Sequence, residues 1–166
     1  GIPTFFMLPV ALTPEDLTAG EVDVAIMGAP LDTGSGMRGA AFGPKTLRGS
    51  DKYLGWGSWS DPHLPVMVDW MQDLTVVDYG DAPIDNLSAE RSMAPVRAMV
   101  KEIAETGAIP MIVGGDHSLE YPNVAAIADV YGKGKVGVVH FDAHLDTGRG
   151  RVHLLDHGQP IYRLMK

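Results

Sequence analysis

Cysteine, long hydrophobic runs and basic clusters are all missing from this 166-residue sequence. Without cysteine the chain forms neither a disulfide nor a thiolate metal site, so any metal ion would need histidine, aspartate or glutamate ligands. The longest apolar runs, such as 108–113, are far shorter than the ~20 residues of a membrane-spanning helix. These absences lead us to expect a cytoplasmic protein without a membrane partner.

Positive charge is also scarce, because 13 basic residues face 21 acidic ones and the net charge is −8. A nucleic-acid surface needs clustered lysine and arginine, so we expect no nucleic-acid partner. The acidic balance instead suits metal ions or a cationic small molecule. With 45% hydrophobic and 20% charged residues, the chain has the composition of one globular domain with a real core.

Short apolar segments alternate with helical patterns along the chain. We expect strands at 22–28, 74–79, 109–113 and 135–141, and helices after Pro44, at 88–106 and at 118–131. Strands that alternate with helices predict an α/β fold with a mainly parallel sheet.

Two of the helices carry clear local signals. Between 88 and 106 the apolar residues fall on one helical face, and they are Met93, Val96, Val100, Ile103 and Ala104. Gly107 is a natural stop for this helix. In the helix at 118–131, Ser118 is a candidate cap and Glu120 adds negative charge to the first turn, where such charge is favoured.

Polar residues follow two of the expected strands where each strand ends. Gly-Gly-Asp-His occupies 114–117, and His-Phe-Asp-Ala-His-Leu-Asp occupies 140–146. In open α/β sheets ligands bind at the carboxyl ends of the strands, so both clusters are candidate site residues.

Within the second cluster, Asp142, His144 and Asp146 are spaced two residues apart. In an extended segment these side chains project to the same side. Paired carboxylates repel each other unless a cation lies between them, and oxygen with imidazole ligands suits Mn²⁺, Fe²⁺, Ni²⁺, Co²⁺ or Zn²⁺. His117 could complete the set. The structural alternative is a polar loop with surface acids and a core histidine, and the Gly-Gly-Asp-His at the next strand end disfavours it.

Together these motifs resemble the signature of the ureohydrolases, the arginase/agmatinase family. Gly-Gly-Asp-His-Ser at 114–118 and Phe-Asp-Ala-His-x-Asp at 141–146 carry the resemblance, and His-Gly-Gln-Pro at 157–160 is similar to an arginase segment. Gly-Ala-Pro-Leu-Asp at 28–32 and Phe-Gly-Pro at 42–44 look like agmatinase-type sequence. The resemblance implies a three-layer arginase-like α/β fold, with a mainly parallel central sheet flanked by helices.

The resemblance also implies roles for individual residues. His117 and Asp146 would bind a first metal ion, His144 a second, and Asp142 would bridge both. Asp116 would orient one of the ligands without binding a metal ion itself. His157 would transfer a proton near the leaving amine, although a plain loop histidine is the alternative and His153 is a rival for the role.

A third family motif, Ser-x-Asp-x-Asp-x-x-Asp-Pro, supplies two further aspartate ligands and does not occur in this sequence. The chain therefore holds four of the six expected ligands. We expect residues 1–166 to form a single ureohydrolase domain that is the N-terminal part of a longer protein.

The function implied is a metal-dependent amidinohydrolase. Two divalent ions, Mn²⁺ first and Ni²⁺ as the alternative, would share a hydroxide that attacks the guanidinium carbon and releases urea. The substrate would be agmatine, a guanidino acid or a substituted guanidine. The family resemblance further suggests a homo-oligomer, a trimer or a hexamer.

Several points stay open at the level of sequence. Arg149 and Arg151 could pair with the carboxylate of a guanidino acid and would repel the amine of agmatine, or they could be solvated surface residues. Trp56 and Trp59 could wall an active site or pack a subunit interface.

Four other functions compete with this prediction. A formimidoylglutamase has similar metal motifs. A deacetylase-like enzyme would show a paired His-His motif. A non-catalytic subunit would tend to lose ligands. A nucleotide-binding domain would need the Gly-x-Gly-x-x-Gly spacing, which the glycine-rich segment at 28–36 lacks.

Overall fold

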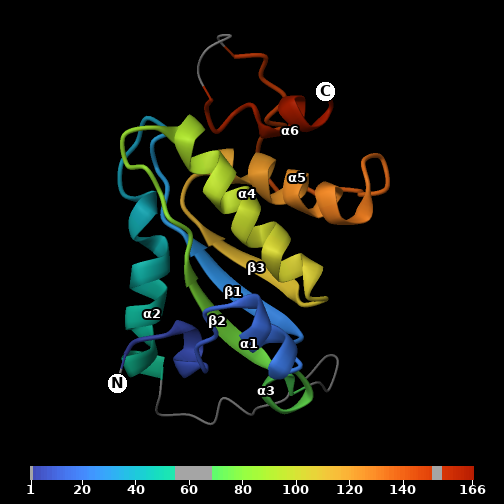
Figure 1. The fold of residues 1–166 in the computed structure, drawn as a ribbon. Coiled ribbons are helices and arrows are strands. Elements are labelled where there is room, and N and C mark those ends of the chain that lie inside the picture. Colours follow the sequence, from blue (N-terminus) through green and yellow to red (C-terminus); the bar gives the residue numbers. More distant parts are fainter. Residues whose placement is uncertain (1, 55–68, 151–154) are drawn as a thin grey trace.

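A three-stranded parallel sheet forms the centre of the molecule, with strand order β2–β1–β3 (Figure 1). The computed structural model describes residues 2–54, 69–150 and 155–166. The strands are β1 (Val24–Ala29), β2 (Val76–Asp81) and β3 (Ile109–Gly114). The α-helices are α1 (Pro14–Ala19), α2 (Gly43–Leu54), α3 (Trp70–Asp73), α4 (Ala89–Glu105), α5 (Glu120–Tyr131) and α6 (Pro160–Leu164). The 3₁₀ turns are η1 (Phe5–Met7), η2 (Ala40–Phe42) and η3 (His117–Leu119).

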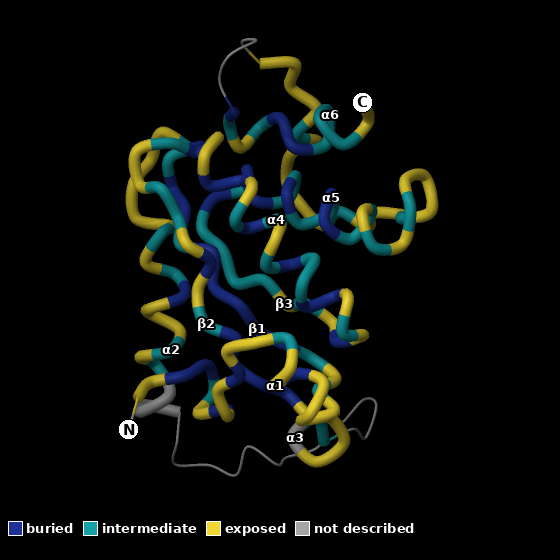
Figure 2. Tube along the Cα trace, viewed as in Figure 1, coloured by how far each residue is buried: buried dark blue, intermediate teal, exposed yellow. Residues whose placement is uncertain are grey.

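The central strand β1 is buried along almost its whole length, as the dark trace in Figure 2 shows. Its alternate residues Ala25, Met27 and Ala29 join the core cluster that contains the apolar face of α4. Ile26 faces the other way and packs with Phe5 of η1 and with Val76. The sheet is therefore covered on both faces, as the predicted three-layer α/β fold requires.

The second face is closed by η1 and α2. A Cβ on Gly28 would lie 2.9 Å from the Cβ of Pro44, so only a glycine lets the start of α2 approach β1 this closely. In Figure 1, α2 lies on one side of the sheet and α4 on the other. The expected helix after Pro44 is confirmed, and its position is fixed by this contact.

Helix α4 confirms the helix predicted at 88–106. The hydroxyl of Ser88 accepts the backbone N–H of Arg91 at the N-terminus, and Gly107, with φ 94°, follows the C-terminal end. Its buried residues include all five apolar residues predicted from the spacing, and they are Ala89, Ser92, Met93, Val96, Val100, Ile103 and Ala104. The apolar spacing in the sequence therefore identified the face that packs on the sheet.

The strand predicted at 135–141 is wrong, because residues 135–141 form no strand. Val139 and Phe141 are 81% and 97% exposed. A strand persists only where a neighbouring strand takes its hydrogen bonds. Within the described parts of the chain, the sheet ends at β3, and residues 135–141 do not pair with its free edge.

Several residues singled out in the sequence lie outside the described residues, and they are Trp56, Trp59, Arg151 and His153. None of the helices in the described segments is long and apolar enough to cross a membrane.

A buried ion-pair cluster joins α2, β2 and η1. The carboxylate of Asp78 accepts hydrogen bonds from Nε and Nη2 of Arg48, each at 2.8 Å, and from the backbone N–H groups of Phe5 and Gly80, each at 2.9 Å. Arg48 also pairs with Asp81 at 2.5 Å. Burial alone would raise the pKa of Asp78, but these hydrogen bonds outweigh it and hold the pKa below the ordinary 3.8.

We predict that Asp78→Asn destabilises the fold at pH 7 by about 3 kcal/mol, because it leaves the Arg48 guanidinium buried with a poorer partner. The folded-state pKa of Asp78 is depressed, so its stabilisation is present above the unfolded pKa and is lost as the pH falls through the folded one. The difference between wild type and variant in urea unfolding should therefore shrink below about pH 4.

Asp129→Asn is the matched control, since Asp129 also pairs with an arginine, Arg97, but at a more exposed position. An equal loss of stability in the two variants would contradict the importance of the Asp78 cluster.

Candidate metal centre

The site begins where β3 passes into a tight backbone turn at Gly115. A Cβ at this position would lie 2.3 Å from the carbonyl oxygen of Leu31 and 2.6 Å from that of Ala29. Only glycine allows this approach, which brings the carboxyl ends of β3 and β1 together. The next two residues, Asp116 and His117, are thereby placed at the sheet edge.

Asp116 is buried and fixes the backbone around His117. Its carboxylate accepts the backbone N–H of Gly34 at 2.8 Å, the backbone N–H of Ser118 at 3.0 Å and the hydroxyl of Ser118. The prediction that Ser118 caps a helix is therefore wrong. Asp116 caps η3, and Ser118 donates hydrogen bonds to Asp116. Asp116 accordingly holds the turn that carries His117.

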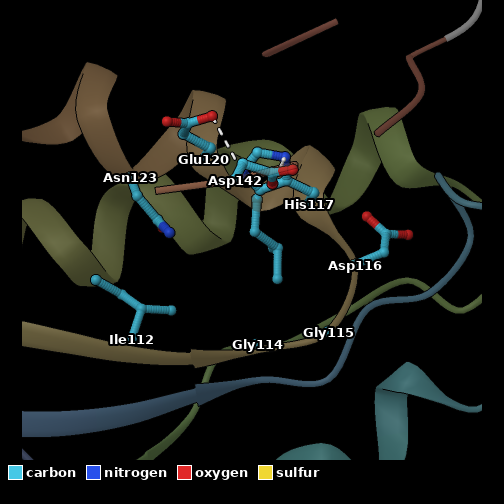
Figure 3. A pocket seen from close by; sticks show the side chains of 9 residues that line it. Ile112, Gly114, Gly115, Asp116, His117, Glu120, Asn123 and Asp142 are labelled. Atoms are coloured by element: carbon cyan, nitrogen blue, oxygen red, sulfur yellow. Dashed lines mark ion pairs between the residues drawn. The ribbon is translucent and has the colours of Figure 1, made fainter. Parts of the chain in front are cut away.

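Four side chains converge beside this turn, with ligand atoms that all lie within 4.8 Å of one another, and they are His117, His140, Asp142 and Asp146. Nδ1 of His117 lies against a carboxylate oxygen of Asp146 and 3.6 Å from Oδ2 of Asp142. Nε2 of His140 lies 3.7 Å from the same Oδ2. Figure 3 shows His117 and Asp142 together, above Gly114 and Gly115.

The segment from 142 to 146 is not extended, in contrast to the geometry expected from the two-residue spacing. The backbone bends at 143 and 144, and Asp146 has φ 45°, in the left-handed region that aspartate tolerates better than most residues. Asp142 and Asp146 consequently converge, whereas the side chain of His144 is 81% exposed. The predicted metal role of His144 stays a prediction; its Nδ1 lies 3.4 Å from Oδ1 of Asp142.

The carboxyl group of Asp142 is held in its ionised form. The backbone N–H of His144 donates to Oδ1 at 2.8 Å and is the main reason that the pKa of Asp142 lies below its ordinary value. Partial burial acts in the opposite direction, and the nearby imidazoles of His117, His140 and His144 lower the pKa further. An ionised carboxylate is the form that binds a metal ion.

The surroundings of the four side chains fit a divalent cation. A pocket of about 400 Å³ lies beside them and is lined by Glu120, Asn123 and Asp142 among others. Among the described residues, Oε2 of Glu120, Oδ1 of Asn123 and Nε2 of His140 are buried without a hydrogen-bond partner. Such atoms are rare in folded proteins and mark a missing partner, and nitrogen and carboxylate oxygen ligands suit Mn²⁺ and its neighbours.

His157 lies on a different segment, before α6. Its backbone N–H donates to the carbonyl oxygen of Gly34 at 3.1 Å, and its ring Nδ1 lies 3.2 Å from the same oxygen. Because a carbonyl only accepts, Nδ1 carries the proton and Nε2 carries the lone pair. Gly34 also donates to Asp116, so one loop residue connects His157 to the turn before His117.

Two residues of this site had no metal-binding role assigned to them from the sequence. His140 belongs to the second polar cluster and precedes Asp142 by two residues, so it continues the same spacing. Glu120 follows His117 by three residues, a spacing that places two side chains together on a helical turn. It was interpreted only as a favourable charge in the first turn of α5.

Comparison with known proteins gives the site its context. Residues 22–166 match the model of the arginase family. The chain belongs to the arginase family. It is 36% identical over 165 residues to the human mitochondrial guanidino acid hydrolase, covering 98% of this chain and 44% of that protein. Family membership confirms the resemblance drawn from the motifs at 114–118 and 141–146.

Solved structures agree with the fold. A hypothetical agmatinase from Burkholderia thailandensis superposes with a TM-score of 0.82 at 30% identity, covering 99% of this chain and 50% of that one. Formiminoglutamase from Trypanosoma cruzi, described with two Mn²⁺ ions, gives 0.78 at 28% identity, with 99% and 52% covered. The chain thus spans about half the length of these relatives. The human relative is named mitochondrial, and the cytoplasmic location of this protein stays a prediction.

We predict that Asp142→Asn weakens Mn²⁺ binding by more than about 100-fold, the upper range for loss of a residue that only supports a ligand. Asp142 lies in the centre of the cluster, near both His117 and His140. Isothermal titration calorimetry on the intact protein measures the effect. Asp129→Asn removes the same charge from the exposed surface and should leave the affinity unchanged; equal affinities in the two variants would exclude Asp142 as a ligand.

Proposed function

We propose that the intact protein hydrolyses a guanidino compound to urea and an amine at a centre of two divalent ions. The observation that carries this proposal is the convergence of His117, Asp142 and Asp146 at the sheet edge of an arginase-family chain. Metal analysis and urea release from the intact protein test the two halves of the proposal.

The reaction adds one water molecule to the guanidinium carbon. A new C–O bond forms, the C–N bond to the substituted nitrogen breaks, and that nitrogen leaves with two protons from water. The products are neutral urea and a protonated amine, so the positive charge of the guanidinium group is kept on the amine. The guanidinium carbon is a poor electrophile because of resonance, and the leaving nitrogen departs easily only when it is protonated.

The acidic side chains of the centre give it the negative charge that binds metal cations and a cationic substrate. Asp142 is ionised, for the reasons given above, and Asp146 adds a carboxylate with only 9% of its side chain exposed. In the proposed arrangement His117 and Asp146 would hold one ion, His144 would hold the other, and Asp142 would be shared by both. Bound divalent ions lower the pKa of water and supply the nucleophile near neutral pH.

His157 is proposed to deliver the proton to the leaving nitrogen. The hydrogen bond between Nδ1 and the carbonyl oxygen of Gly34 fixes the ring and leaves Nε2 to exchange a proton. Because the same glycine is tied to Asp116, the ring is held at a constant position relative to the end of β3. General acid catalysis of this kind contributes about 10²–10⁴ in rate.

The substrate class follows from the family and from the charge of the chain. Guanidino acids and agmatine are both candidates, because the human relative is named a guanidino acid hydrolase and the Burkholderia structure an agmatinase. Arg149, which is exposed, would favour a guanidino acid through its carboxylate if it faces the substrate. Comparison of the two substrates for wild type and Arg149→Ala decides this point.

A formimidoylglutamase-like activity is the second candidate, favoured by the fold similarity to the Trypanosoma enzyme. The formimino substrate lacks the second amino group of a guanidine, so its hydrolysis cannot yield urea. Product identification therefore separates the two activities.

A non-catalytic subunit is the remaining alternative, and the presence of all four family ligand positions in this chain argues against it. We further propose that the bound metal is Mn²⁺ rather than Ni²⁺, which activity after reconstitution with each metal tests. We also propose a homotrimer or homohexamer, which light scattering tests.

We predict that His157→Ala lowers kcat for urea release by about 10²–10⁴ with little change in the number of bound ions, because the proton donor is lost and the ligands are kept. A colorimetric urea assay with agmatine, guanidinobutyrate and guanidinopropionate measures the rate. His153→Ala removes the rival histidine and should keep the wild-type rate; the opposite ranking would reassign the role.

We predict that His144→Ala reduces the metal content from two ions per subunit to one, since the second ion loses its imidazole. Elemental analysis after dialysis against Mn²⁺ gives the count. Two ions retained in this variant, with loss in His140→Ala, would show that His140 supplies the second imidazole instead.

A further inference from the structure

Glu120, the first residue of α5, contacts both histidines of the metal centre through different oxygen atoms. Its Oε1 lies 3.2 Å from Nδ1 of His140, and its Oε2 lies 3.1 Å from Nε2 of His117. The side chain is only 13% exposed. Figure 3 shows it directed from α5 toward His117. One carboxylate thus spans the two rings, whose centroids lie 5.2 Å apart at an interplanar angle of 75°.

The contact with His140 decides which nitrogen of that ring carries the proton. A carboxylate accepts, so the N–H of His140 faces Glu120 at Nδ1. The lone pair is then on Nε2 of His140, a buried atom that has no hydrogen-bond partner among the described residues and lies 3.7 Å from Oδ2 of Asp142. His117 lies between two carboxylates, with its Nδ1 against Asp146 and its Nε2 3.1 Å from Glu120.

The arrangement matches the way proteins orient metal-binding imidazoles. A histidine ligand usually donates its second N–H to a carboxylate, which fixes the ring and makes the ligand nitrogen more basic. The helix dipole would also favour a carboxylate at the start of α5. The dipole alone, however, does not explain why the Glu120 side chain is buried and in contact with a histidine ring.

We infer that Glu120 is the positioning residue of the metal centre, setting the tautomer of His140 so that its lone pair faces the ion site. It acts through His140, to which it is hydrogen-bonded. The inference rests on the proposed metal centre and adds a residue that the two metal motifs do not contain. It also gives His140 a defined place beside Asp142.

The test compares Glu120→Ala and Glu120→Gln in the intact protein, with Glu105→Gln as the matched control. Glu105 carries the same charge on an exposed part of α4, where it pairs with Lys101. Mn²⁺ affinity is measured by calorimetry. The imidazole tautomers are measured by ¹⁵N NMR with Zn²⁺, which is diamagnetic. Glutamine keeps one accepting oxygen, so it can still accept the N–H of His140.

We expect a loss of affinity of about 10–100-fold in Glu120→Ala, a smaller loss in Glu120→Gln and none in Glu105→Gln. The wild-type spectrum should show the Nδ1–H tautomer for His140, and mixed tautomers of this ring should appear in Glu120→Ala. Wild-type affinity and tautomers in Glu120→Ala would overturn the inference and leave the metal centre intact. If wild type binds no divalent ion, the proposed function fails as well. If Glu120→Ala does not fold, the decision passes to Glu120→Gln.

Discussion

The site depends on one buried carboxylate, that of Asp116. It accepts hydrogen bonds from the loop after β1, through Gly34, and from the turn after β3, through Ser118. Parallel strands bring their carboxyl ends to one edge but do not fix the loops that follow. Asp116 does so, and because His157 bonds to Gly34, it also sets where that histidine stands.

Two clusters of aspartates in this chain show that the neighbouring positive groups determine whether an aspartate is structural or binds a cation. Asp78 and Asp81 share Arg48, whose guanidinium is a permanent counterion within the fold, and their cluster is structural. Among the described contacts, Asp142 and Asp146 have only imidazoles as counterions. Imidazoles are weak counterions at neutral pH, so this second cluster keeps a demand for positive charge from outside the chain.

Much of the fold was accessible from the sequence because its signals are local. The apolar spacing of α4, the stop at Gly107 and the three apolar strands each depend on neighbouring residues. The segment 135–141 was misassigned because strand formation depends on a partner edge that no local pattern encodes. The spacing from 142 to 146 predicted three converging side chains, but two bends and a left-handed Asp146 direct His144 outward.

The roles of Glu120 and His140 could not be predicted from local signals or residue spacing alone. They arise because α5 packs against a segment some twenty residues later in the sequence. The sequence shows a helix start at Glu120 and a histidine in a polar cluster at His140, each ordinary by itself. Only their packing brings Oε1 of Glu120 to Nδ1 of His140. Supporting residues of a site are therefore harder to find from sequence than its ligands.

Gly34 gives the molecule an unexpected point of fragility. A Cβ there would come within 2.7 Å of the Ser118 hydroxyl oxygen and 3.1 Å of Asp116 Oδ1, so any larger residue would push the loop away from the turn. The displaced loop would take His157 with it, since that histidine is attached through the glycine carbonyl. A homologous protein could keep every metal ligand and the histidine at position 157 but have a larger residue at position 34. Its sequence would look like that of an enzyme, but the protein would not be active.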